Sequence, residues 1–195
     1  MKKDKLYLII FLAIIFASGA VIYRFQDSRS LRSGHFPISD EQSQFTVTLI
    51  KQISQLKIKL EKDPGNFDLL VKLGNNYYDL NSPAESIKYY ERALEIKPDS
   101  PEVIVDCGVM YRELGEVEKA IEMFSRATQL APDLPQAFFN FGAVLLGEKN
   151  DPRAAAEIWQ KFLTSNPGVT PELKNFFEEK IAQALEKEQE IPAIQ

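Results

Sequence analysis

The sequence predicts an all-α protein: a solenoid of about three helical repeats with flanking helices, behind an N-terminal transmembrane helix. Two observations predict the solenoid. Residue types recur every 34 or 35 residues between residues 64 and 167, and apolar residues within each interval follow helical spacing. A third observation, an uncharged apolar run near the N-terminus, predicts the membrane helix. The 195 residues therefore divide into an anchor or signal at 1–23, a polar tether at 24–43 and a repeat domain at 44–195.

The first segment is an uncharged run from Leu6 to Tyr23. As a helix it spans roughly 27 Å, close to the ~30 Å hydrocarbon core of a bilayer. Three basic residues lie on each side of the run, so the positive-inside rule gives no orientation. The short leading tail favours a cytoplasmic N-terminus, which places the repeat domain in the periplasm or its equivalent. We therefore expect a single-pass membrane protein, and a signal peptide cleaved after Ala20 is the alternative.

Charge distinguishes the two parts of the chain. Residues 1–35 carry a net charge of +4, whereas the remainder carries −9. An acidic body repels phosphate backbones, so we expect no nucleic-acid partner. The basic end lies beside the apolar run, which indicates a membrane as its neighbour.

The period of 34 residues contains two short amphipathic helices and the turns that join them. A glycine in each first helix allows the paired helices to approach, because a side chain there would push them apart. A proline at the start of a helix is tolerated because its missing N–H would be unpaired there anyway. The recurring residues are the glycines Gly74, Gly108 and Gly142, the prolines Pro64, Pro98, Pro132 and Pro167, and the aromatic residues Tyr90, Phe124 and Trp159.

This pattern resembles the tetratricopeptide repeat (TPR) family, whose period is 34 residues. We assign repeats to 67–100, 101–134 and 135–169. The third repeat departs from the family pattern by an extra residue in its turn and by Phe162 where a small residue is usual, so its second helix is expected to lie slightly further out. The second repeat is nearly complete, with Ile104, Cys107, Gly108, Tyr111, Ala120, Phe124, Ala127 and Pro132.

Capping helices are expected on both sides of the repeats, at 44–62 and at 171–190. The first resembles the second half of a degenerate repeat, with Pro64 in the closing position, and a separate dimerisation helix is the alternative. The second begins after Thr170, a residue suited to capping a helix. Such terminal helices keep a repeat array soluble. The apolar face of the first consists of Phe45, Leu49, Ile53, Leu56 and Leu60.

Residues with catalytic or metal-binding chemistry are sparse. The chain has one cysteine and one histidine, and it contains no glycine-rich phosphate loop or paired-cysteine spacing. Cys107 falls at a packing position of its repeat, where we expect a buried, inert thiol. We therefore expect no enzyme, no catalytic residue, no metal, no cofactor and no small-molecule substrate.

The resemblance implies a partner-binding groove on the concave side of the array, lined by the first helix of each repeat. Tyr78 and Phe139 are expected to contribute most to binding, and Arg112 is expected to hold a carboxylate. Family members that bind the acidic tails of heat-shock chaperones use a set of basic and amide residues of which only Asn75 is present, so that role is not expected. The alternative is that some apolar members contact only the next repeat. The predicted groove residues are Val71, Asn75, Tyr78, Val105, Val109, Arg112, Gln136, Phe139, Asn140 and Ala143.

The sequence thus predicts a non-catalytic, membrane-anchored scaffold that binds a peptide segment of a partner protein. Its arrangement resembles the anchored TPR proteins of bacterial cytochrome c maturation, which implies a role in holding an apocytochrome tail. One alternative is a structural subunit of a secretion, pilus or envelope-assembly complex. Another is a cytoplasmic domain that docks a soluble enzyme to the membrane.

Overall fold

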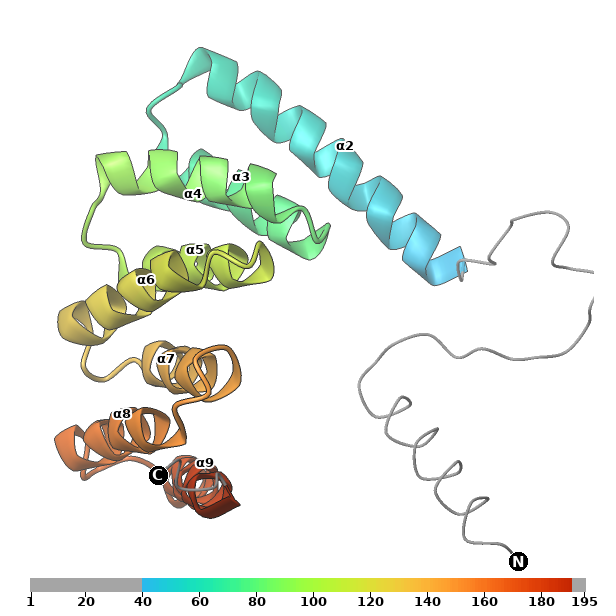
Figure 1. Cartoon of the computed structure of the whole chain (residues 1–195). Coiled ribbons are helices and arrows are strands. Elements are labelled where there is room, and N and C mark those ends of the chain that lie inside the picture. The colour runs from blue at the N-terminus through green and yellow to red at the C-terminus, as the bar shows by residue number, and fades with distance from the viewer. Residues whose placement is uncertain (1–39, 191–195) are drawn as a thin grey trace, which may run out of the picture. The chain divides into compact units, whose positions relative to one another are not determined.

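The computed structural model describes residues 40–190, with side chains from residue 43 onward, and this part of the chain consists of eight α-helices without a strand (Figure 1). The predicted anchor at 1–23 lies outside the described residues. Among the described helices, none combines the length and apolar character that a membrane span needs. The helices are α2 (Asp40–Lys62), α3 (Phe67–Asp79), α4 (Pro83–Ile96), α5 (Pro101–Glu113), α6 (Val117–Leu130), α7 (Pro135–Gly147), α8 (Pro152–Ser165) and α9 (Pro171–Glu190).

Three helix pairs, α3/α4, α5/α6 and α7/α8, follow one another as a stack (Figure 1). We call the first helix of each pair an A helix and the second a B helix. Each B helix packs against its own A helix and against the next helix along the chain. At the ends of the stack, α2 packs against α3 and α9 packs against α8. The prediction of an all-α solenoid is confirmed, although α2 begins at Asp40 rather than at residue 44.

Turns between the A and B helices use left-handed backbone at equivalent places. Asn81, Gly115 and Asn150 have φ angles of 52°, 78° and 50°. Asparagine and glycine tolerate this region better than other residues. The B helices that follow the first and third turns begin with a proline, Pro83 in α4 and Pro152 in α8. The chain therefore reverses direction at the positions where the sequence supplies residues that tolerate the required dihedral angles.

Each A-helix glycine makes room for the aromatic residue of its own B helix. A Cβ atom added to Gly108 would lie 2.7 Å from Cε1 of Phe124, and one added to Gly74 or Gly142 would overlap the ring of Tyr90 or Trp159. Glycine thus permits the paired helices to approach for a specific reason: the aromatic ring of the B helix occupies the space that a side chain on the A helix would take.

The core continues beyond the three pairs into α9. Phe162 is fully buried, and the centroid of its ring lies 5.3 Å from that of Phe138 and 4.5 Å from that of Phe177 on α9. The large residue at this small-residue position thus fills space between α7 and α9. Burial of these rings stabilises the docking of α9 by roughly 1.5–3 kcal/mol per side chain.

Candidate partner-binding face

The predicted groove residues all lie on the A helices α3, α5 and α7, and we call the surface formed by these helices the A-helix face. The helices α5 and α7 pack side by side. Tyr78 of α3 lies within electrostatic reach of Asp106 and Glu113 of α5. The structure therefore brings residues from three repeats together on one face.

Exposure divides the predicted residues into buried, partly buried and exposed groups. Val105 is only 5% exposed and belongs to the core, so its assignment to a binding surface is wrong. The resemblance implied a place in the concave groove for Val105, but packing against the core covers it. Val71 and Val109 are half-buried against the core, and Ala143 is also partly exposed. The exposed members are Asn75, Tyr78 and Gln136.

Phe139 has a structural role in addition to its predicted one. Its ring is half-buried, and the ring centroid lies 5.4 Å from that of Phe176 on α9. Its backbone carbonyl accepts a hydrogen bond of 3.3 Å from the indole N–H of Trp159. Phe139 therefore packs against α9, and its predicted part in partner binding stays a prediction.

Two amide side chains are held in fixed orientations. The Asn75 Oδ1 atom accepts a hydrogen bond of 2.9 Å from the hydroxyl of Tyr90, which leaves its NH₂ group as a donor. The Asn140 Nδ2 atom donates at 2.9 Å to the carbonyl of Gln136, which leaves its Oδ1 atom as an acceptor. One donor and one acceptor match the C=O and N–H groups of an extended peptide.

Arg112 forms an ion pair with Glu148. Its Nε atom lies 2.6 Å from Oε1 of Glu148, and the two side chains are 33% and 26% exposed. A charge-assisted hydrogen bond at this distance balances the guanidinium charge within the chain. The pair connects the end of α5 to the turn after α7, and the role of Arg112 in holding a partner's carboxylate stays a prediction.

The A-helix face carries carboxylates besides the ten groove residues. We call Asp79, Glu102, Asp106 and Glu113 the acidic patch. Asp79, Asp106 and Glu113 raise the pKa of Tyr78, although burial of the phenol contributes most. Within the part of the chain that the structure describes, none of the four has an ion-pair partner.

Asp106 is the most perturbed member of the acidic patch. Burial, with a smaller contribution from the charge of Glu102, raises its pKa from 3.8 to about 6. The sequence carried one signal for this residue, because Asp106 stands 34 positions before Asn140, which was predicted to line the groove. The raised pKa of Asp106 could not be predicted from sequence spacing, because it depends on which elements pack around the carboxyl group.

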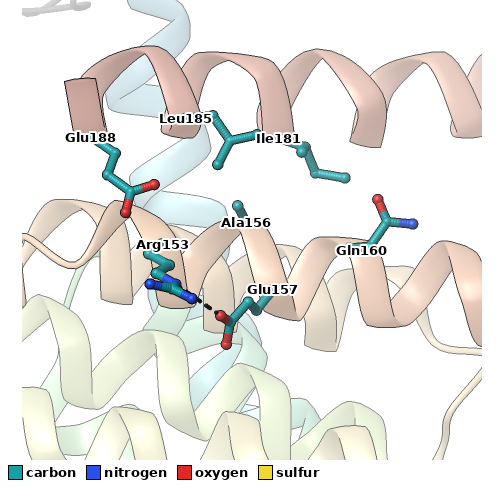
Figure 2. A pocket seen from close by; sticks show the side chains of 7 residues that line it. All are labelled: Arg153, Ala156, Glu157, Gln160, Ile181, Leu185 and Glu188. Atoms are coloured by element: carbon teal, nitrogen blue, oxygen red, sulfur yellow. Dashed lines mark hydrogen bonds and ion pairs between the residues drawn. The ribbon is translucent and has the colours of Figure 1, made fainter. Parts of the chain in front are cut away.

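The surface beside α2 carries positive charge, unlike the acidic patch. A surface cleft between α2 and α3 is lined by Lys59 and Lys72, together with amide side chains and Leu56. A second cleft lies between α8 and α9 (Figure 2). Neither cleft contains a residue of the acidic patch.

The described residues contain neither a metal-binding cluster nor a reactive thiol. Between residues 40 and 190, no group of three or more His, Cys, Asp or Glu side chains is placed to hold a metal ion. Cys107 is fully buried, and burial raises the pKa of its thiol to about 12. Because the thiolate is the reactive form, this cysteine is inert near neutral pH.

Comparison with known proteins identifies the repeats. Residues 67–100 match the family described as "Tetratricopeptide repeat", and residues 108–147 match the family described as "TPR repeat". The first match coincides with the first predicted repeat. A sequence comparison with curated proteins finds no match. The chain therefore contains TPR repeats, as the resemblance implied.

Solved structures share this fold. The crystal structure of MamA has 23% sequence identity and a TM-score of 0.58, and the alignment covers 80% of this chain and 98% of MamA. The Sgt2 TPR domain from Aspergillus fumigatus has 22% identity and a TM-score of 0.55, covering 64% of this chain and 80% of that domain. The first TPR of Spaghetti (RPAP3), bound to the HSP90 peptide SRMEEVD, has 23% identity and a TM-score of 0.51, covering 61% and 92%.

Proposed function

We propose that the protein is a non-catalytic scaffold whose A-helix face binds an extended peptide segment of a partner protein, and that this segment carries lysine or arginine side chains. The observation that carries the proposal is the acidic patch beside Tyr78. Its carboxylates have no ion-pair partner among residues 43–190, and Arg112, on the same face, is already paired with Glu148. A cationic segment would supply the missing counter-charge.

The chemistry of the face suits such a segment. Carboxylates form charge-assisted hydrogen bonds with guanidinium and ammonium groups. The ring of Tyr78, which is 38% exposed, can also receive a cation over its face. The amides of Asn75 and Asn140 are oriented to pair with the peptide backbone, which an extended ligand leaves unpaired. Side-chain charge then selects the ligand, and the amides fix its direction.

An acidic peptide is not expected to bind this face. The RPAP3 domain binds the peptide SRMEEVD, which contains three acidic residues and one arginine. On the present chain such a peptide would meet the carboxylates of the acidic patch, and like charges would repel. We therefore propose a partner of opposite charge to that peptide.

Site-specific photo-crosslinking tests this function. A photoreactive residue placed at Asn75 on the A-helix face should form an adduct with a partner in native membranes, identified by mass spectrometry. The matched control is Glu122, an exposed B-helix residue of α6. Adducts from position 75 alone, containing a lysine- or arginine-rich segment, support the proposal. Equal adducts from both positions, or adducts from position 122 alone, contradict it.

We further propose that Leu6–Tyr23 anchors the chain in a membrane with the repeat domain on the periplasmic side, in the manner of the TPR proteins of cytochrome c maturation. The support is the apolar run and its flanking charges. An uncleaved anchor predicts that the protein stays in the membrane fraction after a high-salt wash and begins at or near Met1. A mature protein that begins at Val21 would contradict the anchor.

A structural subunit of a larger envelope assembly is the second candidate function. The observation that favours it is the exposure of large apolar side chains at both ends of the stack. Val47, Ile50 and Ile58 on α2 are 53–61% exposed, and Leu185 on α9 is 41% exposed. Exposed apolar surface of this kind marks interaction sites.

A further inference from the structure

The two ends of the described stack are incomplete in complementary ways. Each B helix inside the stack lies between its own A helix and the next A helix. After α8, the helix α9 takes the place of the next A helix: it begins at Pro171 and packs on α8. Within residues 40–190 no B helix follows α9, and no A helix precedes α2, which occupies the place of a B helix before α3. Within the described residues, one end of the stack therefore shows an A helix without a B helix, and the other shows a B helix without an A helix.

The C-terminal end exposes an open cleft of about 530 Å³ between α8 and α9. Figure 2 shows Ile181 and Leu185 on α9 facing Ala156 on α8, which gives the cleft an apolar floor. Leu185 is 41% exposed, although it lies at the centre of this surface. The rim is polar and consists of Gln160, Glu188 and the pair Arg153–Glu157, whose Nε and Oε1 atoms lie 3.3 Å apart.

The N-terminal end exposes a second apolar stripe on α2. Val47, Ile50 and Ile58 recur at helical spacing with Ser54 between them, and the three are 61%, 53% and 56% exposed. A different side of the same helix, which includes Ile53 and Leu60, is buried in the core. A helix that is apolar on two sides is suited to packing between two other helices.

Charge is complementary between the two ends. The α9 helix has six glutamates and three lysines, whereas the α2 helix has four lysines and three acidic residues. From residue 43 onward, α2 has four lysines and a single acidic residue, Glu61. Opposite potentials steer two surfaces together and fix their orientation.

We propose that a second copy of this chain occupies the α8/α9 cleft with its α2 helix, which then completes an A/B pair with α9. The contact is heterologous, because α2 of one copy meets α8 and α9 of another, so it joins copies head to tail. It does not rest on the peptide-binding proposal, because it uses no residue of the acidic patch. The A helices of successive copies would then line one extended surface.

Sedimentation velocity of the full chain in detergent tests this assembly with two variants that each block one end. Ile58→Asp blocks the α2 stripe, and Leu185→Asp blocks the cleft; both sites are exposed, so folding should be retained. The unmodified chain should form a series of species that grow with concentration. Each variant alone should remain monomeric, with the dissociation constant raised at least tenfold, whereas their equimolar mixture should form a dimer and stop there. The control is Ile96→Asp on α4, an exposed isoleucine outside both surfaces, which should assemble like the unmodified chain.

Three results would overturn the proposal. The unmodified chain could remain monomeric at all concentrations, or the mixture of variants could fail to dimerise. A single variant that dimerises by itself would indicate a contact between identical surfaces, such as α2 with α2. Binding of a lysine-rich peptide, measured on the same variants, should be unchanged, which separates a failure of assembly from a failure of peptide binding.

Discussion

Replacing Gly108 with valine should destabilise the protein by about 3 kcal/mol through overpacking. A Cβ atom at this position would lie 2.7 Å from Cε1 of Phe124 and 3.1 Å from Cβ of Met123, whereas ordinary contacts lie at 3.4–4 Å. The ring of Phe124 is fully buried and cannot move into solvent. The two methyl groups of valine add to the overlap. The higher helix propensity of valine relative to glycine offsets only a few tenths of a kcal/mol of this loss.

Thermal unfolding followed by circular dichroism measures this effect, and 3 kcal/mol corresponds to a decrease in Tm of roughly 6–12 °C for a domain of this size. The matched control is Gly65→Val, because a Cβ atom at Gly65 meets no atom within 4 Å. Combining Gly108→Val with Phe124→Leu should recover part of the loss, since the ring that clashes is gone. An unchanged Tm for Gly108→Val would refute the packing assigned to all three A-helix glycines.

Three further predictions follow from burial. Because the folded chain raises the pKa of Asp106 to about 6, it binds a proton more tightly than the unfolded chain does, and the free energy of unfolding falls as pH rises from about 4 to 6. In urea titrations, Asp106→Asn should therefore increase the free energy of unfolding by about 1–2 kcal/mol near pH 7.5 and leave it unchanged near pH 4. An equal increase at both pH values would show that the gain does not come from the buried charge of Asp106. The Cys107 thiol should react with a thiol reagent only after unfolding, and rapid labelling of the native chain would contradict its burial. Phe139→Ala should increase hydrogen exchange in α9, because its ring packs on Phe176, and unchanged protection would contradict a stabilising role for this contact.

The architecture could be predicted because its determinants are local and repeat along the chain. Prolines such as Pro101 and Pro135 mark helix starts, and Asn81 and Asn150 supply the left-handed residues of the turns. These constraints act on the backbone of the residue itself or of its neighbours. A single sequence therefore reveals them without knowledge of tertiary packing.

The binding face could be predicted only in part because its chemistry depends on contacts between repeats. Spacing placed Arg112 on the A-helix face, but its partner Glu148 lies in a turn two helices further along the chain. The resemblance implied a groove position for Val105, whereas neighbouring helices bury it. The pKa of Asp106 rises because other elements exclude water from its carboxyl group, which no pattern within α5 specifies.

The most direct test of the central claim is a binding titration with two labelled peptides of equal length, one rich in lysine and arginine and the other with glutamate in those places. Fluorescence anisotropy should detect binding of the basic peptide, with an affinity that falls as salt is raised. The double variant Glu102→Gln/Asp106→Asn should weaken that binding by about tenfold, or about 1.4 kcal/mol. The control Glu122→Gln, an exposed glutamate on α6 without an ion-pair partner in the described range, should leave it unchanged. Equal or tighter binding of the acidic peptide would contradict the claim that the A-helix face selects a cationic partner.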